Sequence, residues 1–242
     1  MVSFFRKIRF TLLEQNKSLR YLKYAIGEII LITIGILIAL QIDSFKTYQN
    51  DRVIEKQLLI NLKTDLQRDT TDLNRLLQTK NTQIVACGYI IDLFDKPNET
   101  IFDFAKYVEG VFAPLAPFID DNPNRTIFEL AKSSGELFTI INDTLKETLT
   151  IYFTDNTLSQ HLSTTKEYTI NNFYIPIEKY PVNVDRWTTK VIQDYLTDYR
   201  IESLYLLMYG RFEEEIQLIS TKIEQAIQLM EQIDNQILQL NK

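Results

Sequence analysis

The hydrophobic pattern divides the chain into one apolar run near the N-terminus and two long heptad-like segments that enclose a more broken middle. The apolar run is residues 24–43, YAIGEIILITIGILIALQID, and before its last residue Glu28 is the only charge. Its first nineteen residues reach about 28 Å as a helix, close to the ~30 Å hydrocarbon core of a bilayer. No polar face is visible along its centre, although a soluble amphipathic helix would show one. The pattern therefore predicts an uncleaved transmembrane helix.

A cleaved export signal and a buried core helix are the alternatives for this run. The uninterrupted centre, Ile29 to Leu40, is short enough to fit either of them. A signal peptide is disfavoured because more than twenty residues precede the run and its exit, IALQID, lacks an A-x-A cleavage pattern.

Charge is distributed unevenly about this run. Residues 1–42 carry a net charge of +4, and residues 43–242 carry −10. Because basic flanks stay in the cytoplasm, we expect residues 1–23 to be cytoplasmic and residues 44–242 to be periplasmic, with the helix in the inner membrane. Residues 3–23 also alternate apolar and basic side chains, as an amphipathic helix on the inner leaflet would. A poorly ordered basic tail is the alternative. The acidic body argues against nucleic acid as a partner.

Four residues of the apolar run suggest a contact between membrane helices. Gly27, Gly35 and Ala39 share one side with Leu31, and small residues at such spacing let a second helix approach closely. Glu28 lies about one turn inside the cytoplasmic boundary, where its side chain can extend toward Lys23 or the lipid headgroups. The other interpretation is that Glu28 pairs with a partner subunit or carries a proton.

Two long segments carry helix-packing patterns. Residues 44–81 place Leu59, Leu62, Leu66, Leu73 and Leu76 at heptad-like spacings, with Asp69 in the missing position of the register. Residues 203–241 are more regular and repeat apolar residues at alternating spacings of three and four: Ile216, Ile219, Ile223, Ala226, Met230, Ile233, Ile237 and Leu240. We predict an antiparallel stalk in which these two segments pair within one chain. Pairing between the chains of a dimer is the alternative.

The middle, residues 82–202, is predicted to form a head of shorter helices. Thr126 with Glu129, and Thr144 with Glu147, have the spacing of capping boxes, and Gly135 is expected to end a helix. One continuous helix is expected from Leu145 to about Tyr174. No alternating strand pattern is longer than a few residues, so the predicted fold class is all-α: a single transmembrane helix followed by an elongated helical bundle with a long stalk.

The sequence contains little that indicates catalysis. The chain has one histidine, His161, and one cysteine, Cys87, so a zinc cluster is not expected, nor is any other metal or cofactor. The stretch STTK from Ser163 matches S-x-x-K without its companion motifs. The acids Glu213 to Glu215 are interpreted as a solvated helix face, and Asp120 with Asp121 as a loop. We do not expect an enzyme.

Two stretches together resemble a known family. FFRKIR…NKSLRYLKYAIGEIILITIGILIALQI is followed by TIFELAKSSGELFTIINDTLKETLTIYF, and the combination is similar to single-pass proteins of Bacteroidota that form domain-of-unknown-function family 6090. The most specific part runs from Tyr24 to Gln41 and includes Gly27, Glu28 and Gly35. The family has no established activity. The resemblance implies an inner-membrane anchor and a periplasmic helical domain.

Three functions are consistent with these features. The leading hypothesis is an anchored interaction or scaffold protein whose partners are the lipid bilayer and either a second copy of the chain or another envelope protein. The second is a periplasmic sensor that binds a small molecule among the middle helices and signals through a separate protein. The third makes Glu28 an ion-coupling carboxylate in a motor or stator assembly.

Overall fold

A computed structural model describes residues 18–96, 104–113, 125–173, 179–180 and 186–241. These residues are almost entirely helical, and none of them forms a strand, so the predicted all-α class is confirmed. The amphipathic helix predicted for residues 3–23 lies largely outside the described residues, as do Asp120 and Asp121.

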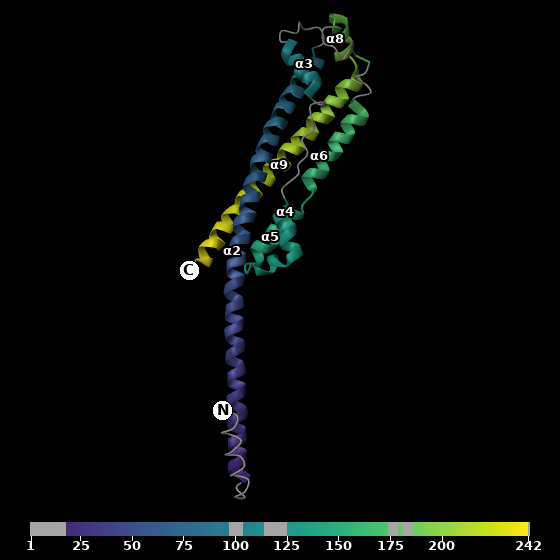
Figure 1. The fold of residues 1–242 in the computed structure, drawn as a ribbon. Coiled ribbons are helices and arrows are strands. Elements are labelled where there is room, and N and C mark those ends of the chain that lie inside the picture. The colour runs from purple at the N-terminus through teal and green to yellow at the C-terminus, as the bar shows by residue number, and fades with distance from the viewer. Residues whose placement is uncertain (1–17, 97–103, 114–124, 174–178, 181–185, 242) are drawn as a thin grey trace. The chain divides into compact units, whose positions relative to one another are not determined.

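The helices follow one another along the chain in the order shown in Figure 1. Their bounds are α2 Ser18–Phe94, α3 Phe104–Phe112, α4 Thr126–Ser134, η2 Glu136–Thr139, α5 Asp143–Thr154, α6 Thr157–Tyr168, η3 Thr169–Phe173, α8 Thr189–Leu196 and α9 Tyr199–Leu240. The chain divides into two compact units, of which the first ends at Ile54 and the second begins at Glu55.

The first unit contributes the N-terminal part of α2. Its apolar side chains are exposed: Ile29, Leu31 and Ile42 each keep close to two thirds of their surface open. The hydroxyls of Thr33 and Ser44 are satisfied within the helix, since Thr33 donates to the carbonyl of Ile29 at 2.8 Å and Ser44 to that of Leu40 at 2.9 Å. A helix whose centre, Ile29 to Leu40, is apolar on all sides and whose Thr33 hydroxyl is hydrogen-bonded within the helix suits an apolar solvent.

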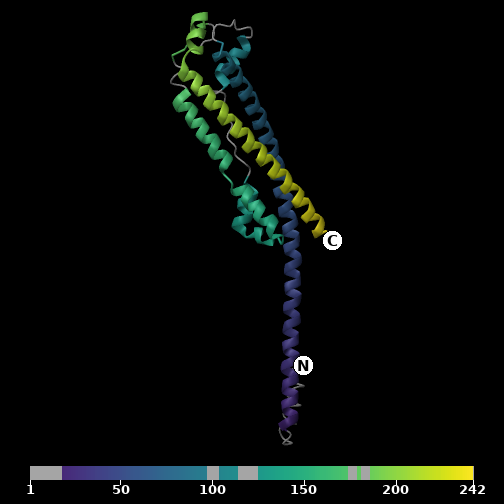
Figure 2. The same cartoon turned by 180° about the vertical axis from the view of Figure 1, so that it is seen from behind.

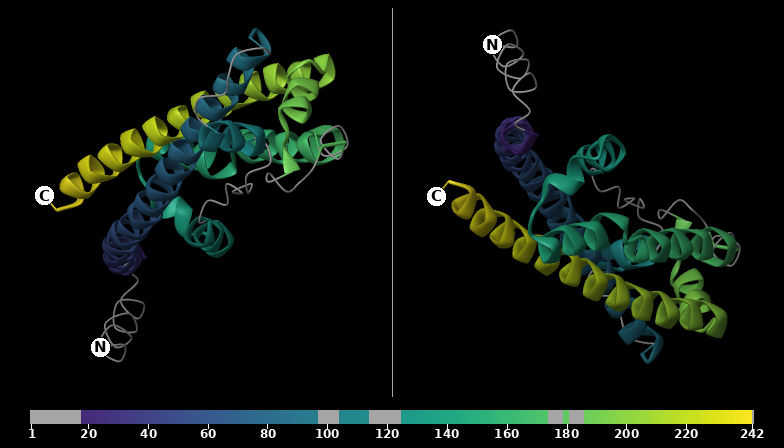
Figure 3. Two further views of the ribbon diagram at one scale, coloured as in Figure 1. Left: turned by 90° about the horizontal axis from the view of Figure 1, so that it is seen from above. Right: turned by 90° about the horizontal axis from the view of Figure 1, so that it is seen from below.

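The second unit is built on an antiparallel pair formed by α2 from Glu55 onward and α9. Lys63 donates to Asp234, and Lys56 to Asn241, so rising residue numbers on α2 meet falling numbers on α9. Figures 1 and 2 show the two helices running in opposite directions, and the end-on views of Figure 3 show them crossing. The pairing is within one chain, as the stalk prediction states.

Three apolar clusters lie along this pair. The base cluster joins Leu59 and Leu62 of α2 to Ile233 of α9 and to α4 and α5. The middle cluster is small and consists of Leu73, Leu76, Leu158, Leu162 and Ile219. The head cluster gathers Cys87 and Ile90 with residues of α3, α8 and the start of α9. The shorter helices therefore pack on the long pair along its length and are not confined to one end.

The long helices extend beyond the predicted stalk boundaries. α2 continues past residue 81 to Phe94, and α9 begins at Tyr199, before residue 203. α2 continues because Ala86, Cys87 and Ile90 are buried in the head cluster, which supplies packing for the extra turns. α9 begins where the side chain of Asp198 accepts a hydrogen bond from the backbone N–H of Arg200 at 3.1 Å.

Both predicted capping boxes are wrong. α4 begins at Thr126 without a side-chain cap. The N-cap of α5 is Asn142, whose Oδ1 accepts from the backbone N–H of Leu145, so Thr144 lies inside the helix. Asparagine is as good a cap as threonine, and it comes first along the chain. The helix end at Gly135 is confirmed: this residue has φ +83°, which favours glycine.

The single helix expected from Leu145 to Tyr174 is broken in two. α5 ends at Thr154, Asp155 has extended backbone, and α6 begins at Thr157. The Asp155 carboxylate accepts from both the backbone N–H and the hydroxyl of Thr157, at 2.9 and 2.6 Å. Asp and Asn compete with helical hydrogen bonding in this way, and the sequence DN at 155–156 is the signal for the break.

Candidate functional site

The proposed membrane-helix contact lies on an open face of the first unit. A methyl group placed on Gly27 or Gly35 would meet nothing within 4 Å among the described atoms. Ala39 is exposed, and Glu28 is partly covered. The face therefore has room for a second helix.

The residues of α9 that are buried agree with only every second residue of the predicted seam. At the other seam positions the buried residue is the one immediately before it in the sequence. Ile219, Ala226 and Ile233 are fully buried. Ile216, Ile223, Met230 and Ile237 are only half-buried, and Leu240 is half-buried at the helix end. The buried residues between Phe212 and Gln236 are instead Phe212, Glu215, Ile219, Lys222, Ala226, Leu229, Ile233 and Gln236. The buried stripe is thus rotated by roughly 50° from the predicted one, half the ~100° step of a helix.

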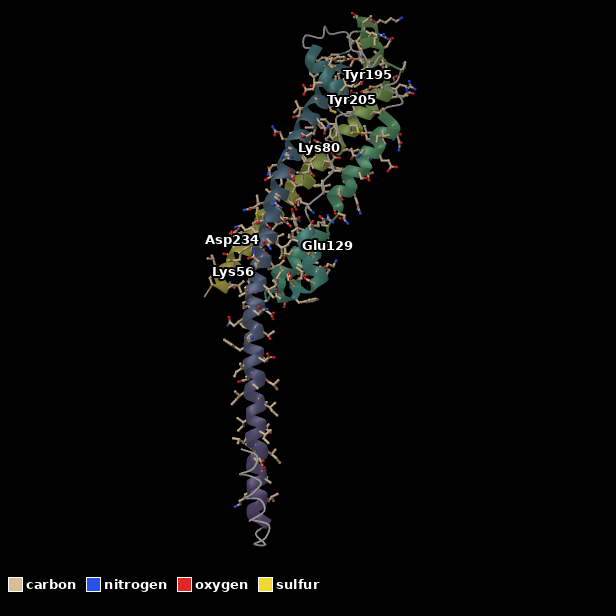
Figure 4. The ribbon with its side chains drawn as sticks, in the orientation of Figure 1. Lys56, Lys80, Glu129, Tyr195, Tyr205 and Asp234 are labelled. Carbon is tan, nitrogen blue, oxygen red and sulfur yellow. The ribbon has the colours of Figure 1, made fainter. Side chains whose placement is uncertain are left out.

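One of these polar residues, Glu215, forms a buried ion pair with Lys80 of α2. The Lys80 Nζ lies 2.8 Å from Glu215 Oε2, and both side chains are almost completely covered. The ammonium also lies 5.0 Å from the ring centroid of Phe212. Figure 4 shows Lys80 between the head and the base of the bundle. The solvated face predicted for Glu213 to Glu215 is wrong at Glu215, because Lys80 lies opposite it.

A second polar contact links α9 to the break between α5 and α6. The buried Lys222 donates to the carbonyls of Tyr152 and Asp155 at 3.3 Å, and its Nζ lies 3.4 Å from Asp155 Oδ2. Hydrogen bonds from Thr157 and the charge of Lys222 lower the pKa of Asp155 despite its partial burial. The interruption between α5 and α6, which sequence reasoning missed, therefore provides hydrogen-bond acceptors for the buried Lys222.

A third polar contact fastens the base. Glu55 Oε1 accepts from Gln236 Nε2 of α9 at 3.0 Å and from the backbone N–H of Ile141 at 3.2 Å. One carboxylate thus holds α2, α9 and the end of the η2 turn together. On that turn Phe138 is 82% exposed while Leu137 and Ile140 point inward and are buried.

The head contains a buried aromatic cluster. The hydroxyls of Tyr195 and Tyr205 are 2.8 Å apart, and Tyr205 also donates toward the carbonyl of Val111 at 2.9 Å. Burial raises the pKa of both phenols well above the ordinary value. Trp187 packs edge-on against Tyr195, with ring centroids 5.2 Å apart. Figure 4 places Tyr195 and Tyr205 together at the head. The phenols stay neutral and act as structural hydrogen-bonding groups.

A surface groove, here called the polar groove, runs along α2 between Asn74 and Ala86 and is closed on one side by residues 109–113 of α3 and its end. It consists of two adjoining hollows of about 500 Å³ each, which share Thr82, Ala86 and Glu109. Sequence reasoning missed it. The available signal was the set of amide and hydroxyl side chains at positions 78, 79 and 81–83, on either side of Lys80.

The residues considered for chemistry are not brought together. Burial raises the pKa of the Cys87 thiol to about 12, so the thiol stays protonated at neutral pH. His161 Nε2 lies 3.5 Å from Glu214 Oε2, and Ser163 is exposed on α6. Across the described ranges, no three His, Cys, Asp or Glu side chains are placed to hold a metal ion.

Among the described residues, one helix is long and apolar enough to cross a membrane, and it is the helix that contains the apolar run. The most apolar stretch of this helix is not buried. This is consistent with a single-pass membrane anchor.

Comparison with known proteins found no match among curated proteins and none among solved structures. The sequence does match a family of unknown function, DUF6090, over residues 28–161, which is more than half of the chain. The match begins inside the apolar run and ends in α6, so it includes the buried Lys80 and the turn at Gly135. The chain belongs to this family of unknown function.

Proposed function

We propose that this protein is a single-pass, membrane-anchored interaction module of the bacterial envelope. Residues 24–43 cross the inner membrane, residues 1–23 lie in the cytoplasm, and residues 44–242 form a helical scaffold in the periplasm. The module binds a second copy of itself or an envelope protein. It has no enzymatic role and no nucleic-acid partner.

The observation that carries the proposal is an apolar helix whose large side chains are exposed among the described residues. Twelve large apolar residues between Leu22 and Ile42 each expose close to half of their surface or more: Leu22, Ile26, Ile29, Ile30, Leu31, Ile32, Ile34, Ile36, Leu37, Ile38, Leu40 and Ile42. At about 25 cal/mol per Å² of apolar surface, leaving such a helix in water is strongly unfavourable. Lipid would cover it, and the basic residues ahead of it support a cytoplasmic N-terminus.

Location can be tested by adding protease to spheroplasts that contain the full-length chain. The proposal expects residues after 43 to be digested from outside, leaving a short N-terminal fragment that contains the apolar run. Protection of the C-terminal body in intact spheroplasts, with digestion only after lysis, would place that body in the cytoplasm and contradict the proposal.

The helix contact at Gly27, Glu28, Gly35 and Ala39 can be tested by disulfide cross-linking in membranes. Since Cys87 is the only native cysteine, the experiment starts from a Cys87→Ala chain. Gly35→Cys and Ala39→Cys should then give oxidised dimers. The matched controls Leu37→Cys and Leu40→Cys lie on the other side of the helix and should give few. Equal yields from all four positions would contradict a defined contact face.

The role of Glu28 separates the anchored scaffold from the motor or stator hypothesis. A scaffold tolerates Glu28→Gln, because the amide still reaches the interface. An ion-coupling carboxylate would lose its function on the same change while the chain still inserts in the membrane. Comparing growth phenotype and membrane insertion of the two strains distinguishes these outcomes.

A ligand-sensing domain that signals through a separate protein is the second candidate. It is favoured by the polar groove, whose volume falls in the range of about 300–1,000 Å³ typical of small-molecule sites.

A further inference from the structure

We propose that one side of α2, just beyond the apolar run, rests on the phospholipid headgroups of the membrane that the run crosses. This side, here called the interface band, consists of Phe45, Tyr48 and Arg52. The inference rests on the proposed membrane anchoring. It adds which side of the helix stays in contact with lipid where the chain leaves the bilayer.

The first argument is a pair of uncovered aromatic rings. Phe45 is 66% exposed and Tyr48 is 50% exposed, and both belong to the first unit. They lie three residues apart on α2, so they share one side of the helix. Ile38, one heptad before Phe45, lies on the same side and is also exposed. The band therefore continues the apolar surface of the run, and lipid that covers the run extends to it.

The second argument is depth. Phe45 follows Ile42 by three residues and Tyr48 follows it by six, and α2 is continuous there. These steps are about 4.5 and 9 Å along a helix. The headgroup layer is about 5–7 Å thick on each side of the hydrocarbon core. Because helical side chains point back toward the N-terminus, both rings reach into that layer. Tyrosine, with an apolar ring and a polar hydroxyl, is enriched at this depth.

The third argument is charge. The guanidinium carbon of Arg52 lies 5.1 Å from the centroid of the Tyr48 ring. The cation is thus directed one turn back toward the membrane, over a ring that lies in the headgroup layer. A guanidinium group matches the oxygens of a lipid phosphate. Lys46 and Asp51 lie outside the band and carry opposite charges, so Arg52 sets the charge of this side.

The other side of the helix lacks these features. Asp43, Thr47 and Asn50 lie opposite the band and offer one carboxylate and no aromatic ring. The proposed helix contact is also elsewhere, since Tyr48 lies about 180° from Ala39 and about 140° from Gly35 around the axis, at ~100° per residue. A second copy of the chain packed on those small residues would leave the band open to lipid.

The test is fluorescence quenching by lipid. The full-length chain is placed in vesicles of phosphatidylethanolamine and phosphatidylglycerol in which some lipids carry a nitroxide on the headgroup. Trp187, the only native tryptophan, is replaced by phenylalanine in every variant. Phe45→Trp and Tyr48→Trp should each lose fluorescence to the nitroxide. Circular dichroism melting shows that each variant folds as the parent does.

Thr47→Trp is the matched control. It introduces the same ring at an exposed position between the other two along the helix, but on the opposite side. It should keep most of its fluorescence. Equal quenching at all three positions overturns the proposal, because the headgroups would then surround the helix without preference. Little quenching at Phe45→Trp and Tyr48→Trp also overturns it, and is the result expected if a second copy covers the band.

The role of Arg52 is tested in the Phe45→Trp chain, in which Tyr48 is intact. Arg52→Gln should reduce the quenching, because the side of the helix that holds the band loses its attraction to phosphate. Lys46→Gln removes the same charge from outside the band and should leave the quenching unchanged. The same effect from both variants would contradict a phosphate contact of Arg52.

A reference variant separates this inference from the anchoring on which it rests. Ile36→Trp lies within the apolar run and should be quenched by lipid that carries the nitroxide near the end of its acyl chain. If it is not quenched, the anchoring proposal fails. If it is quenched while Thr47→Trp matches Phe45→Trp and Tyr48→Trp, the anchor stands and only the interface band is wrong.

Discussion

The apolar run and the paired part of α2 belong to one continuous helix, and they obtain stability in opposite ways. Along residues 29–42 the large apolar side chains are exposed on all sides of the helix. From Glu55 onward one face is buried, and on it Glu55 meets Gln236 and Lys80 meets Glu215, both partners being on α9. The first stretch is stabilised by an apolar solvent around it, and the second is stabilised by contacts with particular residues of α9.

The difference shows where specificity is located in this molecule. Apolar clusters are permissive about register, because a shift of one turn still buries leucine on isoleucine. The buried Lys80 pairs with the Glu215 carboxylate at 2.8 Å, so a shifted register would separate these two charges. The polar residues between the apolar clusters therefore fix how α2 and α9 align, in the manner of polar residues at core positions of coiled coils.

Breaking the ion pair should give the largest effect. Lys80→Met leaves the buried Glu215 without its partner, and we expect a loss of about 3–5 kcal/mol in the free energy of unfolding. The double variant Lys80→Met with Glu215→Leu should recover most of that loss. Urea unfolding of the full-length chain in detergent, followed by Trp187 fluorescence, measures both. Since Trp187 is the only tryptophan, the signal reports the second unit alone. Equal losses in the single and double variants would contradict the role assigned to the pair.

The rotated seam predicts a contrast between two isoleucines three residues apart. Ile219→Ala removes a fully buried side chain and should cost about 2–4 kcal/mol. Ile216→Ala removes a half-buried one and should cost less than about 1 kcal/mol, by the same unfolding measurement. A larger loss at Ile216 would support the seam expected from the sequence in place of the observed one.

Two glycines should respond in opposite directions. Gly135 has φ +83°, so Gly135→Ala should cost about 1–2 kcal/mol. Gly210 lies within α9 with nothing within 4 Å of an added methyl group, so Gly210→Ala should stabilise by about 0.5–1 kcal/mol. Thermal melting by circular dichroism compares them. Matching changes in the two variants would show that the turn does not depend on its backbone conformation.

A further small effect is a pH dependence at the start of α9. The hydrogen bond and charge of Arg200 lower the pKa of Asp198 from its ordinary 3.8 to about 2. A depressed carboxyl pKa stabilises the folded state above pH 4, and that contribution is lost as pH falls from about 4 to 2. After allowance for solvent screening, about 1 kcal/mol is expected. Asp198→Asn should remove this part of the acid sensitivity. A variant that keeps the parent's full dependence would assign it to other carboxylates.

The sequence alone was sufficient for the fold class and for the presence of two long helices, because both depend on periodicity; it left open whether the two helices pair within one chain. Alternating spacings of three and four along residues 216–240 require a helix with a buried stripe, whichever way it is turned. The apolar run at 24–43 could also be recognised from the sequence, because its length and composition define a candidate membrane helix.

The rotation of the stripe was not predictable from periodicity. Isoleucine at 216 and 223 is a better core residue than glutamate at 215 or lysine at 222, so the apolar choice is the natural one. It fails because Lys80 and Asp155, distant in sequence, supply the opposite charges. The polar groove was missed for the same reason. It forms only where Phe112 and Ala113 lie beside α2, and the hydrogen bond from Gln83 to the carbonyl of Ala113 joins residues that are distant in sequence.

The claim on which the functional account depends is that residues 24–43 stay in the lipid bilayer. Alkaline carbonate washing of membranes that contain the full-length chain tests it most directly. The account predicts that the intact chain remains with the membrane pellet and is released only by detergent. Recovery of the intact chain in the carbonate supernatant would contradict it.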